Sequence, residues 1–150
     1  MYLIDSFIPV LTFVVDSMEQ QTGAKESEVD ALDYEKFRAD VVRLIEASSI
    51  DDDSRMPKAL FDDAKFAAMA FIDERVLSSN WDKRHQWARD LLQKKYFNTT
   101  NGGVEFYERL QVLSPYQPFE KGVIEVFYYC LCLGFVGNYY KYEDQPRLNA

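Results

Sequence analysis

The residue types that most often carry out chemistry are scarce in this sequence. Its single histidine is His85, and its two cysteines are Cys130 and Cys132. A structural zinc site needs about four Cys or His ligands, so these three residues at this spacing do not predict one. The acidic run 51–53 lacks the alternating oxygen ligands and the loop glycine of a calcium-binding loop. The sequence therefore predicts neither a metal site nor a cofactor.

One acidic pair, Asp73 and Glu74, could supply a general acid and a general base. Neighbouring residues on a helix point about 100° apart, so the two carboxyl groups are not expected to face each other across a substrate. His85 could join them from the next helix, but no nucleophile elbow, phosphate-binding loop or dinucleotide fingerprint accompanies it. We therefore expect no enzymatic activity and keep a helical hydrolase, using His85 with a carboxylate, as the remote alternative.

The same pair is better suited to contact with another protein. In the helix predicted at 57–79, Asp73 points away from the apolar stripe and Glu74 lies at its edge. Trp81 follows within eight residues, and aromatic residues dominate binding hot spots. Asp73, Glu74 and Trp81 are therefore predicted to contact a basic or amphipathic partner. The alternative is an ordinary solvated helix face beside a core tryptophan.

The elements that must position these residues are predicted to be helices of one domain, 1–150. Segment 123–136 carries a single charge, Glu125, and is apolar on every side, so it is predicted to be the buried central helix. The expected fold is all-α, a compact bundle of six to eight helices. Amphipathic spacing of three and four marks the other segments, at 3–20, 29–47, 57–79, 83–97 and 104–113.

Composition supports a folded, acidic protein. Hydrophobic residues make up 47% of the chain and aromatic residues 15%, enough for a real core. The net charge is -8, and residues 16–63 hold 14 acidic and 6 basic side chains. Such a surface repels phosphate backbones, so nucleic acid is an unsuitable ligand and a basic protein surface is a better one. The alternative is that these charges only keep the surface solvated.

The cysteines and the apolar segments indicate the compartment. Cys130 and Cys132 are two residues apart, which places them on roughly opposite sides of a helix, so they are expected to be reduced and buried. The first eighteen residues lack the basic start of a signal peptide. No segment reaches the roughly 20 apolar residues needed to span a bilayer. The chain is therefore expected to be soluble and cytoplasmic.

Residues 71–140 also carry a set of short motifs whose order and spacing match those of a known family. The matching pieces are Phe71 through Leu77, Trp81, Trp87, Asn101 through Tyr107, and Glu125 through Tyr139, which ends in L-x-L-G-F-x-G-x-Y. The opening segment 3–9 matches as well. On these residues the chain resembles the DotU family, which includes the TssL proteins of type VI secretion systems.

The resemblance implies a hook-like cytoplasmic domain of two three-helix bundles, followed by one C-terminal transmembrane helix. That helix is missing before Ala150, so the chain is expected to be a soluble part of an inner-membrane protein, on the cytoplasmic side. The implied partners are the IcmF-like protein TssM, the baseplate protein TssK and a second copy of the chain. The membrane complex that contains TssM also contains the lipoprotein TssJ. No enzymatic activity is implied. A DotU component of a type IVB system is the alternative.

The resemblance also implies roles for individual residues. The acidic pair of the family, which contributes to baseplate contacts, corresponds to Asp73 and Glu74. Two positions depart from the family pattern: Asn138 stands where arginine is common, and Asp82 follows Trp81 where glycine is frequent. The remaining matches are structural, with Gly102 and Gly103 as a turn and Gly134, Phe135, Gly137 and Tyr139 as packing at the end of the last helix.

Overall fold

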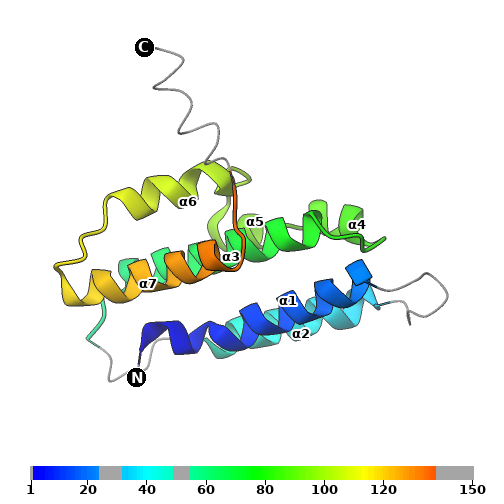
Figure 1. Cartoon of the computed structure of the whole chain (residues 1–150), viewed down its shortest axis with the longest axis horizontal. Coiled ribbons are helices and arrows are strands. Elements are labelled where there is room, and N and C mark those ends of the chain that lie inside the picture. The colour runs from blue at the N-terminus through cyan, green and yellow to red at the C-terminus, as the bar shows by residue number, and fades with distance from the viewer. Residues whose placement is uncertain (1, 24–31, 49–54, 138–150) are drawn as a thin grey trace, which may run out of the picture.

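The computed structural model describes residues 2–23, 32–48 and 55–137, and these ranges contain helices and loops but no strand. The all-α fold class is therefore confirmed. The elements, shown in Figure 1, are the 3₁₀ helix η1 (Leu3–Ser6) and the α-helices α1 (Ile8–Gly23), α2 (Tyr34–Ala47), α3 (Lys58–Leu77), α4 (Arg84–Ala88), α5 (Leu92–Phe97), α6 (Gly102–Gln111) and α7 (Pro118–Cys132).

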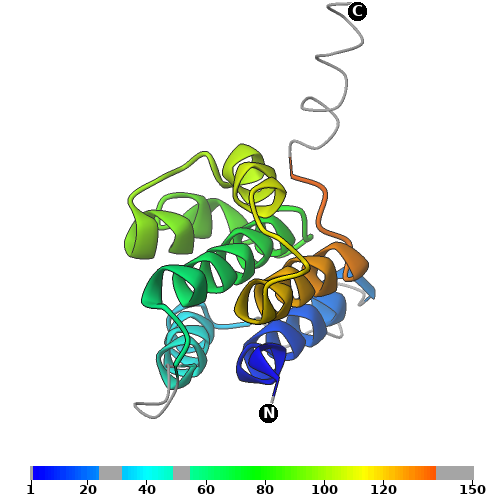
Figure 2. The ribbon, with the colours of Figure 1, turned by 90° about the vertical axis from the view of Figure 1, so that its left-hand side faces the viewer.

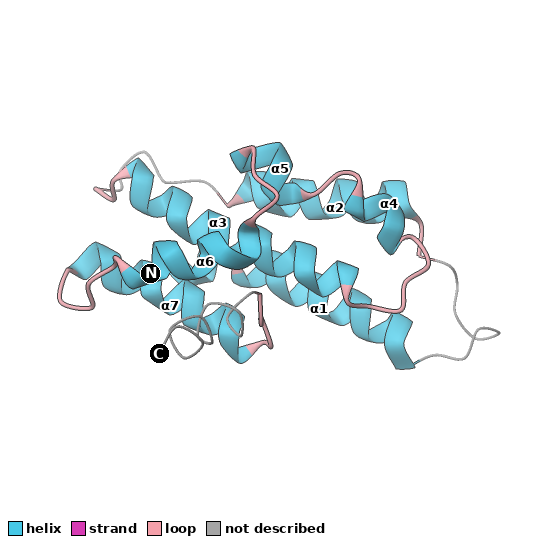
Figure 3. Ribbon diagram, turned by 90° about the horizontal axis from the view of Figure 1, so that it is seen from above, coloured by secondary structure: helices cyan, strands magenta, loops and turns pink. Residues whose placement is uncertain are grey.

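The helices form three layers around α3. In the end-on view of Figure 2, α1 and α2 lie below α3 and α7, while α6 and the α4–α5 pair lie above. Figure 3, seen from above, shows α6 crossing over the pair formed by α3 and α7. The more detailed expectation of two three-helix bundles in a hook stays a prediction.

The central helix is α3, and the prediction that segment 123–136 has this place is wrong. Helix α3 contacts α1, α4, α5, α6 and α7. Alanines on α3 let the neighbouring helices approach closely, and Ala64, Ala67 and Ala68 are fully buried. An unbroken block from 66 to 73 is also buried, so α3 is covered on every side along this stretch.

Helix α7 is instead covered on one side. Its buried side packs against α3 and η1, with Val126 and Phe127 fully buried, whereas Tyr128 is 56% exposed. The helix begins at Pro118 and ends at Cys132, which is exposed. The apolar composition of segment 123–136 therefore predicted more burial than the structure shows, because Tyr128 and Cys132 are exposed to solvent.

Two further boundaries differ from the predictions. The single helix predicted at 83–97 is split into α4 and α5, and the turn predicted at Gly102 is the start of α6. Among the described helices, none combines the length and apolarity that a bilayer crossing requires.

Candidate functional site

Asp73 is buried, so the prediction that it faces solvent is wrong. Its side chain is 1% exposed, and its carboxylate accepts four hydrogen bonds. Oδ1 accepts from Trp87 Nε1 at 2.8 Å and from the Leu92 amide at 2.9 Å. Oδ2 accepts from the Gln93 amide at 3.0 Å and from Gln93 Nε2 at 3.1 Å. The apolar stripe of α3 indicates one packed face, but α4 and α5 cover the opposite face as well.

The carboxylate of Asp73 explains why segment 83–97 is split. The amides of Leu92 and Gln93 are the first two of α5 and have no partner within that helix. Both donate to Asp73, so α3 supplies the cap for α5 from 19 and 20 residues away in sequence. A continuous helix would have used these amides internally. Burial raises the pKa of the Asp73 carboxyl, and the four hydrogen bonds lower it in part.

Gln93 extends this network to α6. Its side chain is 7% exposed, and Oε1 accepts the amide of Gly102 at 2.7 Å. A Cβ at Gly102 would lie 2.5 Å from that oxygen, so any larger residue here would have to displace the Gln93 amide. The prediction of a turn at Gly102 and Gly103 is wrong, because these two residues are the first two of α6.

Glu74 lies beside Asp73 but holds a different segment. Its two carboxylate oxygens accept the amides of Val136, at 2.8 Å, and Gly137, at 2.6 Å. Gly134 follows the end of α7 and has a φ of 108°, and the amides of Gly134 and Phe135 donate to the carbonyls of Leu131 and Cys130 in the last turn of the helix. Phe135 is 5% exposed and stacks on Phe106, with ring centroids 4.1 Å apart. The acidic pair therefore forms two internal joints.

Trp81 also lies inside the domain. It is 1% exposed, and its ring stacks on Tyr34 at 5.9 Å and meets Phe37 edge-on at 5.3 Å. Its indole Nε1 donates to the carbonyl of Leu32 at 3.2 Å. The prediction that Trp81 offers a contact surface is wrong, and the alternative of a core tryptophan holds. Tyr139 and Asn138 lie outside the described residues.

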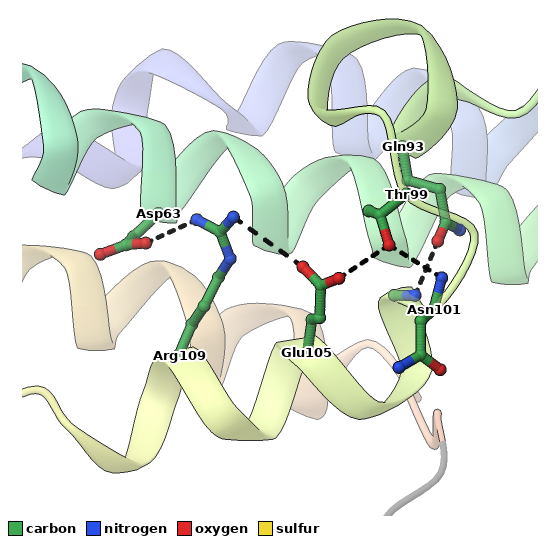
Figure 4. Close-up of polar contacts among 7 residues, drawn as sticks. Asp63, Gln93, Thr99, Asn101, Glu105 and Arg109 are labelled. Atoms are coloured by element: carbon green, nitrogen blue, oxygen red, sulfur yellow. Dashed lines mark hydrogen bonds and ion pairs between the residues drawn. The ribbon is translucent and has the colours of Figure 1, made fainter.

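An ionic network that the sequence reasoning missed joins α6 to α3. Figure 4 shows Arg109 between Asp63, at 2.7 Å, and Glu105, at 3.9 Å. Glu105 also accepts from Thr99 Oγ1 at 2.7 Å, and the Arg109 guanidinium lies 4.2 Å from the Phe66 ring centroid. The spacing of four residues between Glu105 and Arg109 was the available signal. Glu105 lies in the first turn of α6 and Arg109 in its last turn, so the network holds both ends of the helix.

A hollow of about 320 Å³ adjoins the acidic pair. Of its lining, Leu77 is 38% exposed and Glu74 is half-buried, so these side chains border solvent. Asp73 is among the lining residues, but its carboxylate is buried and accepts four hydrogen bonds from α4 and α5. The complete lining is Ala70, Asp73, Glu74, Leu77, Ser78, Gln93, Gly103, Phe135 and Gly137. The hollow thus combines negative charge with an apolar rim.

Both the sequence and the fold match a known family. The family model of the type VI secretion system protein DotU matches residues 2–150. The chain belongs to the DotU family. It is also similar to a solved structure, the cytoplasmic domain of TssL from Acinetobacter baumannii, with 26% sequence identity and a TM-score of 0.76 over 93% of this chain and 85% of that chain. The search of curated proteins gave no match.

The catalytic alternative finds little support in this DotU protein. His85 is exposed on α4, whereas Asp73 is buried and accepts its hydrogen bonds from Trp87, Leu92 and Gln93. In ranges 2–23, 32–48 and 55–137, His, Cys, Asp and Glu side chains form no cluster of three suited to a metal. His85 is therefore not among the residues that donate hydrogen bonds to the Asp73 carboxylate.

The predicted acidic surface can be described only in part. Six of the 14 acidic residues in 16–63 lie outside the described residues, in segments 24–31 and 49–54. On α1, Glu19 forms an ion pair with Arg75 of α3, with 3.8 Å between Glu19 Oε1 and Arg75 Nη2. The role of the acidic surface in docking stays a prediction.

Proposed function

We propose that this DotU protein is a non-enzymatic structural component of a type VI secretion system that links the inner-membrane complex to the cytoplasmic baseplate. The proposal rests on the family match over residues 2–150, together with the similarity to a TssL cytoplasmic domain. Its partners are the IcmF-like protein TssM, the baseplate protein TssK and a second copy of the chain. The domain acts on the cytoplasmic side of the inner membrane.

The docking surface that we propose is the rim of the hollow beside α3. Of the predicted contact residues, Asp73 and Trp81 are buried, which leaves Glu74 and its neighbours Leu77 and Ser78. A carboxylate at the rim favours a basic segment of the partner, and an exposed leucine favours apolar contact. Charges at an interface rim mainly set association rate and salt dependence, so binding should weaken as salt rises.

Binding of purified TssK to the domain tests this surface. Leu77→Arg replaces an exposed apolar side chain at the rim by a positive charge that repels a basic partner, and we expect about tenfold weaker binding, a loss of about 1.4 kcal/mol. Val112→Arg is the matched control, because Val112 is 73% exposed and does not line the hollow. If the Leu77→Arg variant bound TssK with the same affinity as the unaltered domain, the hollow would not be part of the docking surface.

A cellular experiment tests the wider assignment. Deleting the gene should stop release of the secretion tube protein, and His85→Ala should restore release as well as the unaltered gene does. Loss of release in the His85→Ala strain, with normal protein level, would instead support the hydrolase. The type IVB alternative is not favoured, since the matching family model describes a type VI component. Genes for a contractile sheath and a secretion tube next to this gene would support the type VI assignment.

A further inference from the structure

The five residues that follow α7, 133–137, form a strap across α3 and α6. Its middle is anchored by Phe135, whose ring lies against Phe106 and Tyr107 of α6. Its end is held by polar contacts: the carboxylate of Glu74 accepts two amides of the strap, and Tyr107 Oη donates to the carbonyl of Val136 at 2.7 Å. The strap is thus fixed at two points with different chemistry.

Apolar burial does not hold the end of the strap. The side chain of Val136 is 58% exposed, and Gly137 has no side chain. Two consecutive amides need two acceptors, and the carboxylate of Glu74 supplies both at distances typical of charge-assisted bonds. An amide side chain would supply one acceptor and would turn an N–H donor toward the second backbone N–H. The ionised glutamate is therefore the chemically matched group.

Glycine at position 137 is the second requirement. Its φ is 55°, and a Cβ there would lie 2.9 Å from the carbonyl oxygen of Gly103 and 2.7 Å from the Phe135 ring. The chain can pass between α6 and Phe135 only without a side chain. At the other end of the strap, Gly134 has a φ of 108° and open space around it. The second residue of the strap, Gly134, and its last residue, Gly137, thus both have left-handed conformations.

We propose that Glu74 is a latch that holds the end of the strap closed, and that its loss frees residues 136–137 while Phe135 and α7 stay in place. The closed latch fixes the backbone of Val136 and Gly137 against α3. Gly137 also lines the hollow, so opening the latch removes part of its wall while Phe135 keeps its place there. The latch is internal to this domain and does not depend on which proteins the domain contacts.

Amide hydrogen exchange of the full chain, resolved by residue, tests the latch. In Glu74→Gln, the amides of Val136 and Gly137 should exchange about ten to a hundred times faster, since bonds to a charged group are among the stronger ones. Exchange within α3 and α7 should stay as in the unaltered protein. Tyr107→Phe removes one contact and should give a smaller increase at Val136. Glu108→Gln, an exposed residue of α6, is the matched control and should change neither amide.

Two outcomes would overturn the proposal. One is unchanged exchange at Val136 and Gly137 in Glu74→Gln, and the other is an equal increase throughout α3 and α7, which would mean that Glu74 only supports global stability. If Glu74→Gln does not fold, Gly137→Ala gives a second test that keeps the carboxylate. This variant should free residues 136–137 in the same way, because its Cβ meets Gly103 and Phe135.

Discussion

The indole nitrogen of Trp87 lies 2.8 Å from Oδ1 of Asp73, and both side chains are buried. This bond ties α4 to α3, and the same carboxylate receives the first two amides of α5. Gln93, which also donates to Asp73, accepts a hydrogen bond from the amide of Gly102 at the start of α6. Asp73 is thus the point where α3, α4 and α5 are joined, and its charge is used inside the domain.

Replacing Asp73 by asparagine should destabilise the fold strongly. Four donors point at the carboxylate, whereas asparagine offers one acceptor oxygen and an amide that is itself a donor. Because buried donors would lose their partners, we expect the free energy of unfolding to fall by about 2–4 kcal/mol. Chemical denaturation followed by tryptophan fluorescence measures it. Asp62→Asn, on the same helix but partly exposed, should change it by less than about 1 kcal/mol.

The pH dependence of stability should carry the signature of Asp73. Burial raises the pKa of Asp73 in the folded state above 3.8, the value that we take for the unfolded chain. At a pH between the unfolded-state and folded-state pKa values, the folded protein therefore binds a proton that the unfolded chain releases. The contribution of Asp73 is therefore full below pH 3.8 and is lost as pH rises through the folded pKa. The difference in unfolding free energy between the unaltered protein and Asp73→Asn should shrink over that window. A difference that grows with pH would mean that the hydrogen bonds outweigh burial.

Two glycine-to-alanine substitutions should have opposite effects. At Gly102 a Cβ would lie 2.5 Å from Oε1 of Gln93, so Gly102→Ala should displace Gln93 and cost about 1–3 kcal/mol. At Gly122, inside α7, the nearest atom to a Cβ is Cβ of Leu3 at 3.8 Å, an ordinary contact. Gly122→Ala should therefore stabilise the helix by about 0.5–1 kcal/mol. Thermal midpoints should shift down and up respectively, and a shared direction would contradict this account.

The two cysteines should react at very different rates. Burial raises the pKa of the Cys130 thiol to about 12, whereas Cys132 is exposed. Since the thiolate is the reactive form, a thiol reagent at pH 8 should modify one cysteine in the folded protein and the second only after unfolding. Cys132→Ser should abolish the fast reaction. A fast reaction that persists in this variant would show that Cys130 is accessible.

The sequence by itself determined the helical class and the approximate helices, because the spacing of apolar residues along a chain is a local property. The periodicity of α3 is an example, since the segment predicted at 57–79 contains the observed helix Lys58–Leu77. The ordered motifs from Phe71 to Tyr139 also determined the family, which the match over residues 2–150 confirms. These features depend on residue order alone.

Only the tertiary structure decided which faces of these helices are covered. Asp73 stands opposite the apolar stripe of α3, yet it is buried because α4 and α5 bring donors from 14 to 20 residues away. Glu74 receives amides from 62 and 63 residues away. Helical periodicity distinguishes a packed side from an unpacked one, but it does not encode how many neighbours a helix has. Hydrogen-bond partners so distant in sequence are set by the packing of whole helices, and this packing turned an apparent surface pair into two internal joints.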